Sequence, residues 1–310
     1  MKHILFIGGA GFIGSNIIHQ LIQCKKSVFV LEPEFASLHR LNDISVGIYR
    51  GELLNFDYLK SIILDNQIDT VVHLVSTLIP GSSFEDYQRE FTNVVFPSIR
   101  LMELCCERDI KFVYFSSGGT VYGDRKGEPI PFVEEDPMAP ISYYGWSKQM
   151  MENSILYMNR TQKLKYLIIR PSNPYGKGQN LHGRQGLIAV ALGKILSGES
   201  IDVWGDGGSI RDYIYIDDLG KAIVDLLNND SIVNRTINIG SGEGYSINDI
   251  LDVIRSVVSE EVSVQYIPAR QVDVSSVILD TRQLKNLITF NPISIKEGIS
   301  RFYNDVKNGK

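Results

Sequence analysis

The chain has 310 residues, of which 44% are apolar and 22% charged, so its composition is that of a folded globular protein rather than a disordered or fibrous one. Its 31 basic and 36 acidic residues give a formal charge of −5 without a long run of either sign, which argues against nucleic-acid binding. No apolar run approaches the about 20 residues of a membrane helix. Because the 3 cysteines cannot form a disulfide framework, we expect a soluble cytoplasmic protein.

The first fifty residues predict a strand, a helix and a second strand. An apolar run at residues 4–7 is followed by a glycine cluster, a helical pattern at 12–24 and another apolar run at 28–31. Unbroken runs of this kind are typical of strands buried on both faces of a parallel sheet. Three more occur at residues 70–75, 112–115 and 166–169. The pattern predicts an α/β fold with a Rossmann-like, doubly wound parallel sheet.

The remainder of the chain predicts a second, smaller α/β domain at the C-terminal end. Helices are predicted at residues 93–108 and 142–159, and the proline-rich segment 123–140 between them is predicted to be a surface loop. After Arg170, a turn-rich passage leads to a helix at residues 186–196. We place the sheet domain at 1–172, with strands returning to it near 212–218 and 236–240, and the smaller domain at 173–211 and 241–310.

Gly8, Gly11 and Gly14 lie between the first strand and the first helix. Glycines so placed permit a tight turn, close approach of the backbone to a pyrophosphate, and close packing of helix on strand. The second strand ends at Glu32, about 20 residues downstream, where a carboxylate can bind an adenosine ribose. Such a carboxylate would repel a 2′-phosphate, so we expect NAD(H) rather than NADP(H). The alternative is a solvated glutamate at a strand end.

Tyr144 and Lys148 are four residues apart on a predicted helix, so their side chains share one face. A free tyrosine has a pKa near ~10 and is a poor base at neutral pH. A nearby lysine and a nicotinamide cation would together stabilise the phenolate. This spacing also occurs by chance in many proteins, and it is the glycine loop that makes an acid–base pair the favoured interpretation.

Five segments together resemble the extended short-chain dehydrogenase/reductases over essentially the whole chain. They are the glycine loop, the stretch Phe115-Ser-Ser-Gly-Gly-Thr-Val-Tyr-Gly123, the Tyr144 and Lys148 pair, Asn173-Pro-Tyr-Gly, and Arg211-Asp-Tyr-Ile. Within that superfamily the chain looks most like the NAD-dependent epimerase/dehydratase family, and there most like epimerases of the UDP-glucose (UDP-galactose) 4-epimerase type. The resemblance implies an NAD-binding sheet domain and a smaller domain that binds a nucleotide sugar.

The resemblance also implies roles for individual residues. Tyr144 would be the base and acid for the sugar C4 hydroxyl, and Lys148 would hold the nicotinamide ribose. The other implied cofactor contacts are Gly8, Gly11, Phe12, Ile13, Gly14, Glu32, Val75, Ser76, Asn93, Ser116 and Pro171. The implied substrate contacts are Ser117, Asn173, Leu187, Arg211, Arg270 and Asp273, with the two arginines on the diphosphate and Asp273 on a ribose hydroxyl.

The 115–123 segment departs from the family pattern at Gly118, where relatives place a serine or threonine hydrogen-bonded to the sugar O4. Ser117 and Thr120 are therefore the candidate catalytic hydroxyls. Nucleotide-sugar 4,6-dehydratases carry an Asp-Glu pair where this chain has Gly119 and Thr120. Because elimination would then lack its acid and base, dehydration is disfavoured.

These observations predict a nucleotide-sugar 4-epimerase that uses bound NAD for transient oxidation at C4. The sugar is glucose or galactose, or an N-acetylated or uronic analogue. One alternative is an NAD(P)H-dependent reductase of a 4-keto-6-deoxy nucleotide sugar, and another is a non-catalytic NAD-binding regulator. The five histidines share no ligand spacing, so no metal is expected. Similar proteins are dimers through the helices at 93–108 and 142–159, so we expect a homodimer.

Overall fold

The computed structural model describes residues 2–125, 130–183, 185–268 and 274–309 and contains, over these ranges, a seven-stranded parallel sheet. From one edge to the other, its strands are β10 (Arg235–Ile239), β6 (Tyr166–Pro171), β5 (Lys111–Phe115), β4 (Thr70–His73), β1 (His3–Ile7), β2 (Ser27–Glu32) and β3 (Gly47–Arg50). The chain runs outward from β1 to β3 and then restarts on the other side at β4. A crevice therefore opens at the carboxyl ends of β1 and β4, where such sheets bind ligands. The predicted fold class is confirmed.

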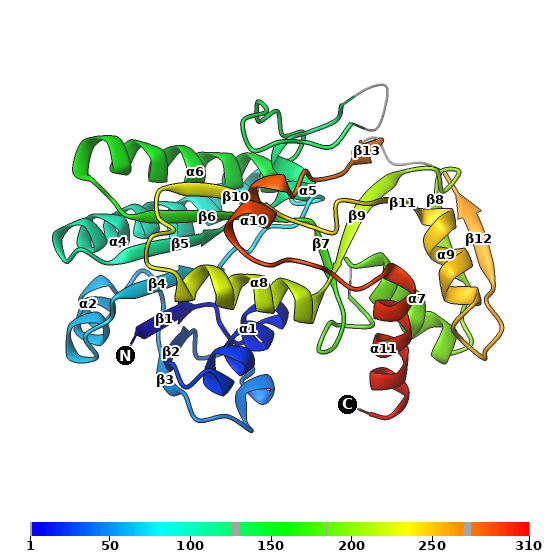
Figure 1. The fold of residues 1–310 in the computed structure, drawn as a ribbon, viewed down its shortest axis with the longest axis horizontal. Helices are drawn as coiled ribbons and strands as arrows, with labels where there is room; N and C mark the ends of the chain where they lie inside the picture. The colour runs from blue at the N-terminus through cyan, green and yellow to red at the C-terminus, as the bar shows by residue number, and fades with distance from the viewer. Residues whose placement is uncertain (1, 126–129, 184, 269–273, 310) are drawn as a thin grey trace.

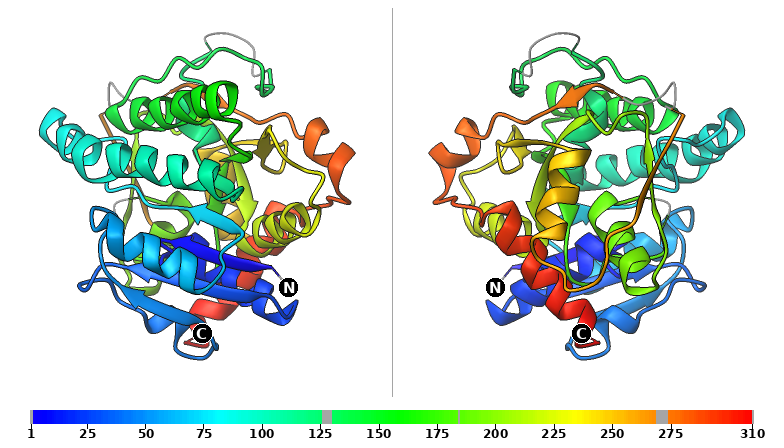
Figure 2. Two further views of the ribbon diagram at one scale, coloured as in Figure 1. Left: turned by 90° about the vertical axis from the view of Figure 1, so that its left-hand side faces the viewer. Right: turned by 90° about the vertical axis from the view of Figure 1, so that its right-hand side faces the viewer.

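Helices cover both faces of this sheet, as Figures 1 and 2 show. One face carries α2 (Phe56–Asp65), α4 (Phe96–Glu107) and α6 (Tyr143–Gln162). The other carries α1 (Phe12–Gln23), α8 (Ile216–Asn228) and α10 (Arg282–Leu287). In β1, Leu5 and Ile7 pack towards the first group, and Ile4 and Phe6 towards the second. Strands buried on both faces explain the unbroken apolar runs in the sequence.

A π-helical turn, Phe91–Val95, joins α3 (Phe84–Glu90) to α4. Pro97 lies in the first turn of α4 and has no N–H, so it cannot donate to the carbonyl of Asn93, four residues earlier. The N–H of Phe96 donates to the carbonyl of Phe91, five residues earlier. The helix predicted to begin at residue 93 is thus the end of a longer helical segment, and Asn93 lies in its irregular turn.

The smaller part of the molecule lies beyond the carboxyl ends of the main strands (Figure 1). Its strands are β7 (Asn173–Tyr175), β9 (Ile210–Tyr215), β11 (Gly244–Ser246) and β13 (Ser276–Val277), with β8 (Ile201–Trp204) paired to β12 (Val264–Ile267). Its helices are α7 (Leu187–Leu196), α9 (Ile247–Arg255) and α11 (Ile295–Lys307), which share a separate apolar core with β8 and β9. Two short elements complete the chain, the 3-10 turn η1 (His39–Leu41) and α5 (Gly118–Val121).

The expected return of a strand near 212–218 to the main sheet is wrong. That segment contains β9, which pairs with β7, β11 and β13. The return to the main sheet is made by α8, which packs on its face, and by β10, which pairs with β6 as predicted. An apolar run shows that a strand is buried but does not identify its partner, because both parts of the molecule offer an apolar core. The division into two domains stays a prediction.

The segment 123–140 is a loop over its described residues, as predicted. It reaches the smaller part of the molecule, because the N–H of Phe132 donates to the carbonyl of Ile278, and the N–H of Asp280 donates to that of Phe132. Within the described ranges, no helix has both the length and the apolar character needed to cross a membrane.

Candidate active site

The glycine loop connects β1 to α1 at the crevice. Gly8 has φ +81°, and a Cβ there would lie 2.8 Å from the Cγ2 of Val75. A Cβ at Gly14 would lie 2.5 Å from the carbonyl oxygen of Gly9, so this glycine lets helix and loop pack closely. By contrast, the nearest atom to a Cβ at Gly11 is 3.8 Å away, and α1 begins there without a side-chain cap. Open space above uncapped N–H groups fits a pyrophosphate, so the residues present fit the phosphates of NAD.

Glu32 ends β2 and is buried against the glycine loop. Its Oε1 accepts a hydrogen bond of 2.6 Å from the N–H of Ala10. Burial raises the pKa of Glu32, while this hydrogen bond and the positive charge of Arg50 lower it. The carboxylate therefore orders the loop in addition to standing where an adenosine ribose is expected.

Tyr144 and Lys148 lie in the first turns of α6, which begins where the Ser142 side chain accepts a hydrogen bond from the N–H of Gly145. The Nζ of Lys148 donates to the carbonyl of Phe115 at 2.8 Å and lies 5.6 Å from the Tyr144 ring centroid. Burial lowers the pKa of Lys148 to about 8. Burial also raises the pKa of Tyr144, which opposes the lowering expected from Lys148 and a nicotinamide cation.

A cavity of about 210 Å³ lies above this pair, at the carboxyl ends of β5 and β6. Seven of the predicted site residues line it, namely Ile13, Ser76, Ser116, Ser117, Tyr144, Lys148 and Pro171. Ser172 also lines the cavity and was not predicted. Its Oγ is buried and has no hydrogen-bond partner among the described residues. A buried hydroxyl without a hydrogen-bond partner in the protein is available to hydrogen-bond a ligand.

The two candidate hydroxyls differ in their surroundings. Ser117 lies within hydrogen-bond reach of the Tyr144 phenol and lowers its pKa against the larger effect of burial. Thr120 is not among the residues that line the cavity, and its Oγ1 is buried without a hydrogen-bond partner among the described residues. The structure therefore places Ser117, rather than Thr120, beside the phenol.

Gly118 has no space for a side chain, because a Cβ there would lie 2.6 Å from the Cδ1 of Leu279. Leu279 is fully buried and comes from the smaller part of the molecule. Gly119 differs, since a Cβ there would lie at ordinary van der Waals distances, 3.7 Å from the Asn173 Oδ1 and 3.9 Å from the Ser117 Oγ. Residue 119 therefore has room for a side chain, but as a glycine it supplies no carboxyl group.

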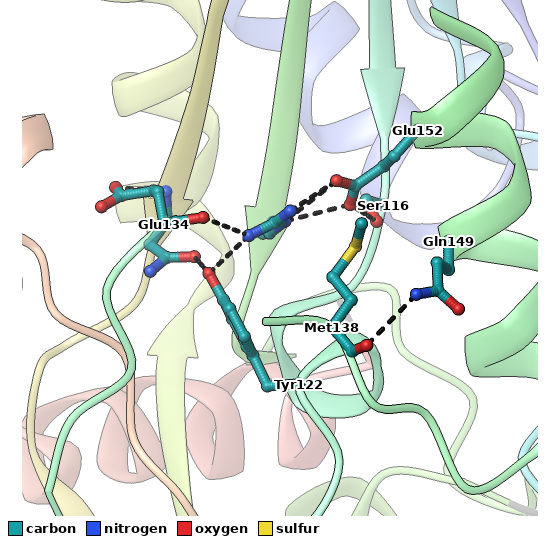
Figure 3. A network of polar contacts seen from close by, with 8 residues as sticks. Ser116, Tyr122, Glu134, Met138, Gln149 and Glu152 are labelled. Carbon is teal, nitrogen blue, oxygen red and sulfur yellow. Dashed lines mark hydrogen bonds and ion pairs between the residues drawn. The ribbon is translucent and has the colours of Figure 1, made fainter. Parts of the chain in front are cut away.

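A buried polar network lies behind the cavity (Figure 3). The hydroxyl of Ser116 donates to Glu152 on α6, which is ion-paired with Arg170 on β6 at 2.6 Å. Arg170 also donates to the phenol oxygen of Tyr122 and to the carbonyl of Glu134. Ser116, predicted to contact the cofactor, thus uses its hydroxyl to connect the wall of the cavity to this network.

Three of the predicted substrate contacts, Asn173, Leu187 and Arg211, belong to elements of the smaller part. The Nδ2 of Asn173 donates to the carbonyl of Asp212 at 2.8 Å. Arg211 donates to the carbonyls of Ile210 and Val274. Leu187 is the first residue of α7. Arg270 and Asp273 lie outside the described residues.

Asn93 is exposed in the π-helical turn and is not among the residues lining the cavity, so its contact with the cofactor stays a prediction. Phe12 opens α1, and Val75 packs against Gly8. Sequence reasoning missed Glu90, a buried carboxylate near the pair on α6. In the sequence, Glu90 is marked only as a charged residue three positions after Tyr87, which is buried on the same helix.

A second hollow, of about 1130 Å³, lies between α1, α8 and α11. Its lining mixes basic side chains such as Arg40 and Lys221 with acidic ones such as Asp217 and Asp225. It contains none of the predicted site residues. Among the described residues, no group of three histidine, cysteine or acidic side chains could hold a metal ion.

Known proteins resemble this chain over nearly its whole length. A family model described as the NAD dependent epimerase/dehydratase family matches residues 4–240. A protein of Methanocaldococcus jannaschii named "Putative UDP-glucose 4-epimerase" is 33% identical over 311 residues, covering 98% of each chain. The dTDP-4-dehydro-6-deoxyglucose reductase of Escherichia coli is 30% identical over 320 residues, covering 98% of this chain and 97% of that protein. The crystal structure of the UDP-glucose 4-epimerase of Thermotoga maritima with UDP-glucose matches with a TM-score of 0.92 at 28% identity, over 99% of each chain.

Proposed function

Because this chain belongs to the NAD-dependent epimerase/dehydratase family, we propose that it is a nucleotide-sugar 4-epimerase that works by transient oxidation at C4. Its substrate is UDP-glucose and UDP-galactose, or an N-acetylated or uronic analogue. The Methanocaldococcus relative and the Thermotoga structure, both named as UDP-glucose 4-epimerases, support this choice. The observation that carries the proposal is the convergence of Tyr144, Lys148 and Ser117 on one cavity beside the glycine loop.

Each of these residues has a role in the proposed reaction. Tyr144 takes the proton of the C4 hydroxyl and later returns it, while Ser117 hydrogen-bonds the phenol and orients the sugar O4. Lys148, fixed by the carbonyl of Phe115, holds the nicotinamide ribose and contributes positive charge. The glycine loop and Lys148 would hold NAD, which would supply a reversible acceptor for the C4 hydride, so that hydride could return to the opposite face of the sugar.

The surroundings of residue 119 support epimerisation over elimination. A side chain at this position would meet Ser117 and Asn173 at ordinary van der Waals contact, so an acid could be accommodated there, but the chain has glycine. Elimination needs a group to take the C5 proton and another to protonate the departing hydroxyl. Dehydration therefore has neither group at these positions.

The second candidate function is reduction of a 4-keto-6-deoxy nucleotide sugar with NAD(P)H as a consumed reductant. The Escherichia coli relative, named a dTDP-4-dehydro-6-deoxyglucose reductase, favours it. The same tyrosine and lysine would serve, with Tyr144 as proton donor. Glu32 favours NADH as the reductant, because its carboxylate at the end of β2 would repel a 2′-phosphate.

We also propose that the protein is a cytoplasmic homodimer whose interface is formed by α4 and α6. These helices pack side by side on one face of the sheet. They carry exposed aromatic side chains, Phe96 on α4 and Trp146 and Tyr157 on α6. Aromatic residues are enriched where protein surfaces associate.

The proposed function can be tested with purified protein and no added coenzyme. Proton NMR should show interconversion of UDP-glucose and UDP-galactose, or of their N-acetylated or uronic counterparts. Tyr144→Phe should lower turnover by a factor of about 10³ or more while leaving NAD bound. Tyr143→Phe is the matched control, because Tyr143 packs on Tyr87 and does not line the cavity. Mole-for-mole consumption of NADH with a 4-keto sugar, without interconversion, would establish the reductase instead.

A further inference from the structure

Glu90 is a buried carboxylate that the proposed reaction does not use. It ends α3 and is 2% exposed. Its Oε2 accepts hydrogen bonds from the N–H of Thr77 at 2.9 Å and from the Thr77 hydroxyl at 2.6 Å. Thr77 directly follows Ser76, which lines the cavity. The carboxylate is therefore fixed behind the loop that forms one wall of the cavity.

α3 holds Glu90 against the start of α6. Tyr87, one turn before Glu90, stacks on Trp146 with ring centroids 4.8 Å apart and lies 5.4 Å from the ring centroid of Tyr143. Tyr143 and Trp146 flank Tyr144 in sequence on α6. At its other end, α3 begins with a capping box formed by Ser83 and Asp86. Because the capping box and the packing of Tyr87 on α6 both hold α3, the position of the carboxylate is determined by its surroundings.

Two acidic groups raise the pKa of Lys148, Glu90 more strongly than Glu152. On α6, Glu152 is also ion-paired with Arg170 of β6, which offsets part of its charge. On β4, burial lowers the pKa of His73 to about 3, so its imidazole is neutral. On β5, burial raises the pKa of Tyr114, so its phenol is neutral. On α3, the exposed Asp86 and Arg89 pair with each other.

We propose that Glu90 is a positioning residue for acid–base chemistry: its fixed carboxylate keeps Lys148 charged and sets the pH range in which Tyr144 can accept a proton. The inference rests on the proposed function only in that Tyr144 is its acid–base group. A negative charge in a buried site interacts strongly with neighbouring groups, because little water is present to screen it. The carboxylate thereby adds to the effect of burial in keeping the phenol of Tyr144 protonated.

The electrostatic effects have a defined direction. Burial is the largest influence on both groups, raising the pKa of Tyr144 and lowering that of Lys148. The charge of Glu90 raises both pKa values. Removing that charge should therefore lower the pKa of Tyr144 and of Lys148 together, and both limbs of the pH–rate profile should move to lower pH.

The test is a pH titration of the Tyr144 phenol by near-ultraviolet absorbance in the parent chain and in Glu90→Gln. Each titration is corrected by subtracting that of the same protein with Tyr144→Phe added. We expect the midpoint to fall by roughly one pH unit in Glu90→Gln. Because this titration needs no substrate, its result does not depend on whether the protein has the proposed epimerase activity. An unchanged midpoint would overturn the inference.

Two further variants separate charge from structure. Glu90→Asp keeps the charge and should titrate close to the parent chain. Thr77→Val removes one hydrogen bond but keeps the carboxylate, so it should leave the midpoint near that of the parent, and a fall equal to that of Glu90→Gln would also overturn the inference. If Glu90→Gln does not fold, Glu90→Met combined with Thr77→Val removes the charge together with its donor hydroxyl. This double variant should lower the Tyr144 midpoint by the amount expected for Glu90→Gln, and an unchanged midpoint would again overturn the inference.

Discussion

The backbone at Gly118 is shaped by a side chain from a distant part of the sequence. A Cβ at this residue would lie 2.6 Å from the Cδ1 and 2.9 Å from the Cδ2 of Leu279, and 3.2 Å from the carbonyl oxygen of Arg170. Leu279 is fully buried, so it has little freedom to move. Residue 118 therefore has to be glycine as long as residue 279 is leucine.

Gly118→Ser should destabilise the folded protein by about 1–3 kcal/mol, because it overpacks this contact. Adding Leu279→Ala should recover part of that loss by making space for the serine. Leu279→Ala alone should destabilise by about 2–5 kcal/mol, since it leaves a cavity. Urea denaturation of the three variants measures the coupling, and strictly additive free energies of unfolding would contradict it.

Lys148→Met should stabilise the folded chain while abolishing turnover. Burial lowers the pKa of Lys148 from 10.5 to about 8, so holding its ammonium costs on the order of 3 kcal/mol at neutral pH. Because the folded pKa is below the unfolded one, this cost is present below about pH 8 and disappears as the pH rises to about 10.5. Urea denaturation should find the advantage of Lys148→Met at pH 7 much reduced at about pH 10. If the greater stability of Lys148→Met did not change with pH, the charge of Lys148 would not be its cause.

At the scale of elements, α6 is joined to β6 by the buried pair of Glu152 and Arg170. Glu152 is fully buried, and its carboxylate accepts from Arg170 Nε as well as from the terminal nitrogen. Glu152→Gln should cost about 3–5 kcal/mol, because it leaves a buried guanidinium without its counter-charge. Glu297→Gln is the matched control. Its partner Arg301 is about half exposed, so the loss of stability by urea denaturation should be far smaller. Equal losses of stability in Glu152→Gln and Glu297→Gln would mean that burial does not strengthen the ion pair of Glu152 and Arg170.

The elements that could be predicted from the sequence are those with a local cause. The strands β1, β2, β4, β5 and β6 are continuous apolar runs because both of their faces are covered, and α6 buries Met151, Ile155 and Met158 at helical spacing. The partner of β9, the π-helical turn and the contact of Gly118 with Leu279 depend on residues far apart in the chain. The pair of Tyr144 and Lys148 has a fixed helical spacing, whereas Glu90 belongs to no motif and is brought to the site by packing alone.

At the scale of the whole molecule, the proposed dimer leads to a prediction. Phe96 is 56% and Tyr157 is 55% exposed on two adjacent helices. Replacing both with glutamate should convert a dimer to a monomer, because buried like charges would meet across the interface. Sedimentation velocity measures the change. Phe35→Glu is the control, since Phe35 is 86% exposed in the segment after β2 and should leave the assembly intact. A monomeric parent chain would exclude the dimer.

The hydrogen bond from Ala10 to Glu32 has a consequence for any attempt to exchange the coenzyme. The usual route to accept a phosphorylated adenosine would be to remove the carboxylate at the end of β2. Here the same carboxylate is the acceptor for a backbone N–H in the phosphate-binding turn, and that N–H would be left buried without an acceptor. Selectivity and loop order are therefore coupled through one side chain. A successful exchange must keep a neutral acceptor for Ala10, as the amide oxygen of Glu32→Gln would, whereas a substitution that removes the acceptor oxygen should weaken the binding of both coenzymes.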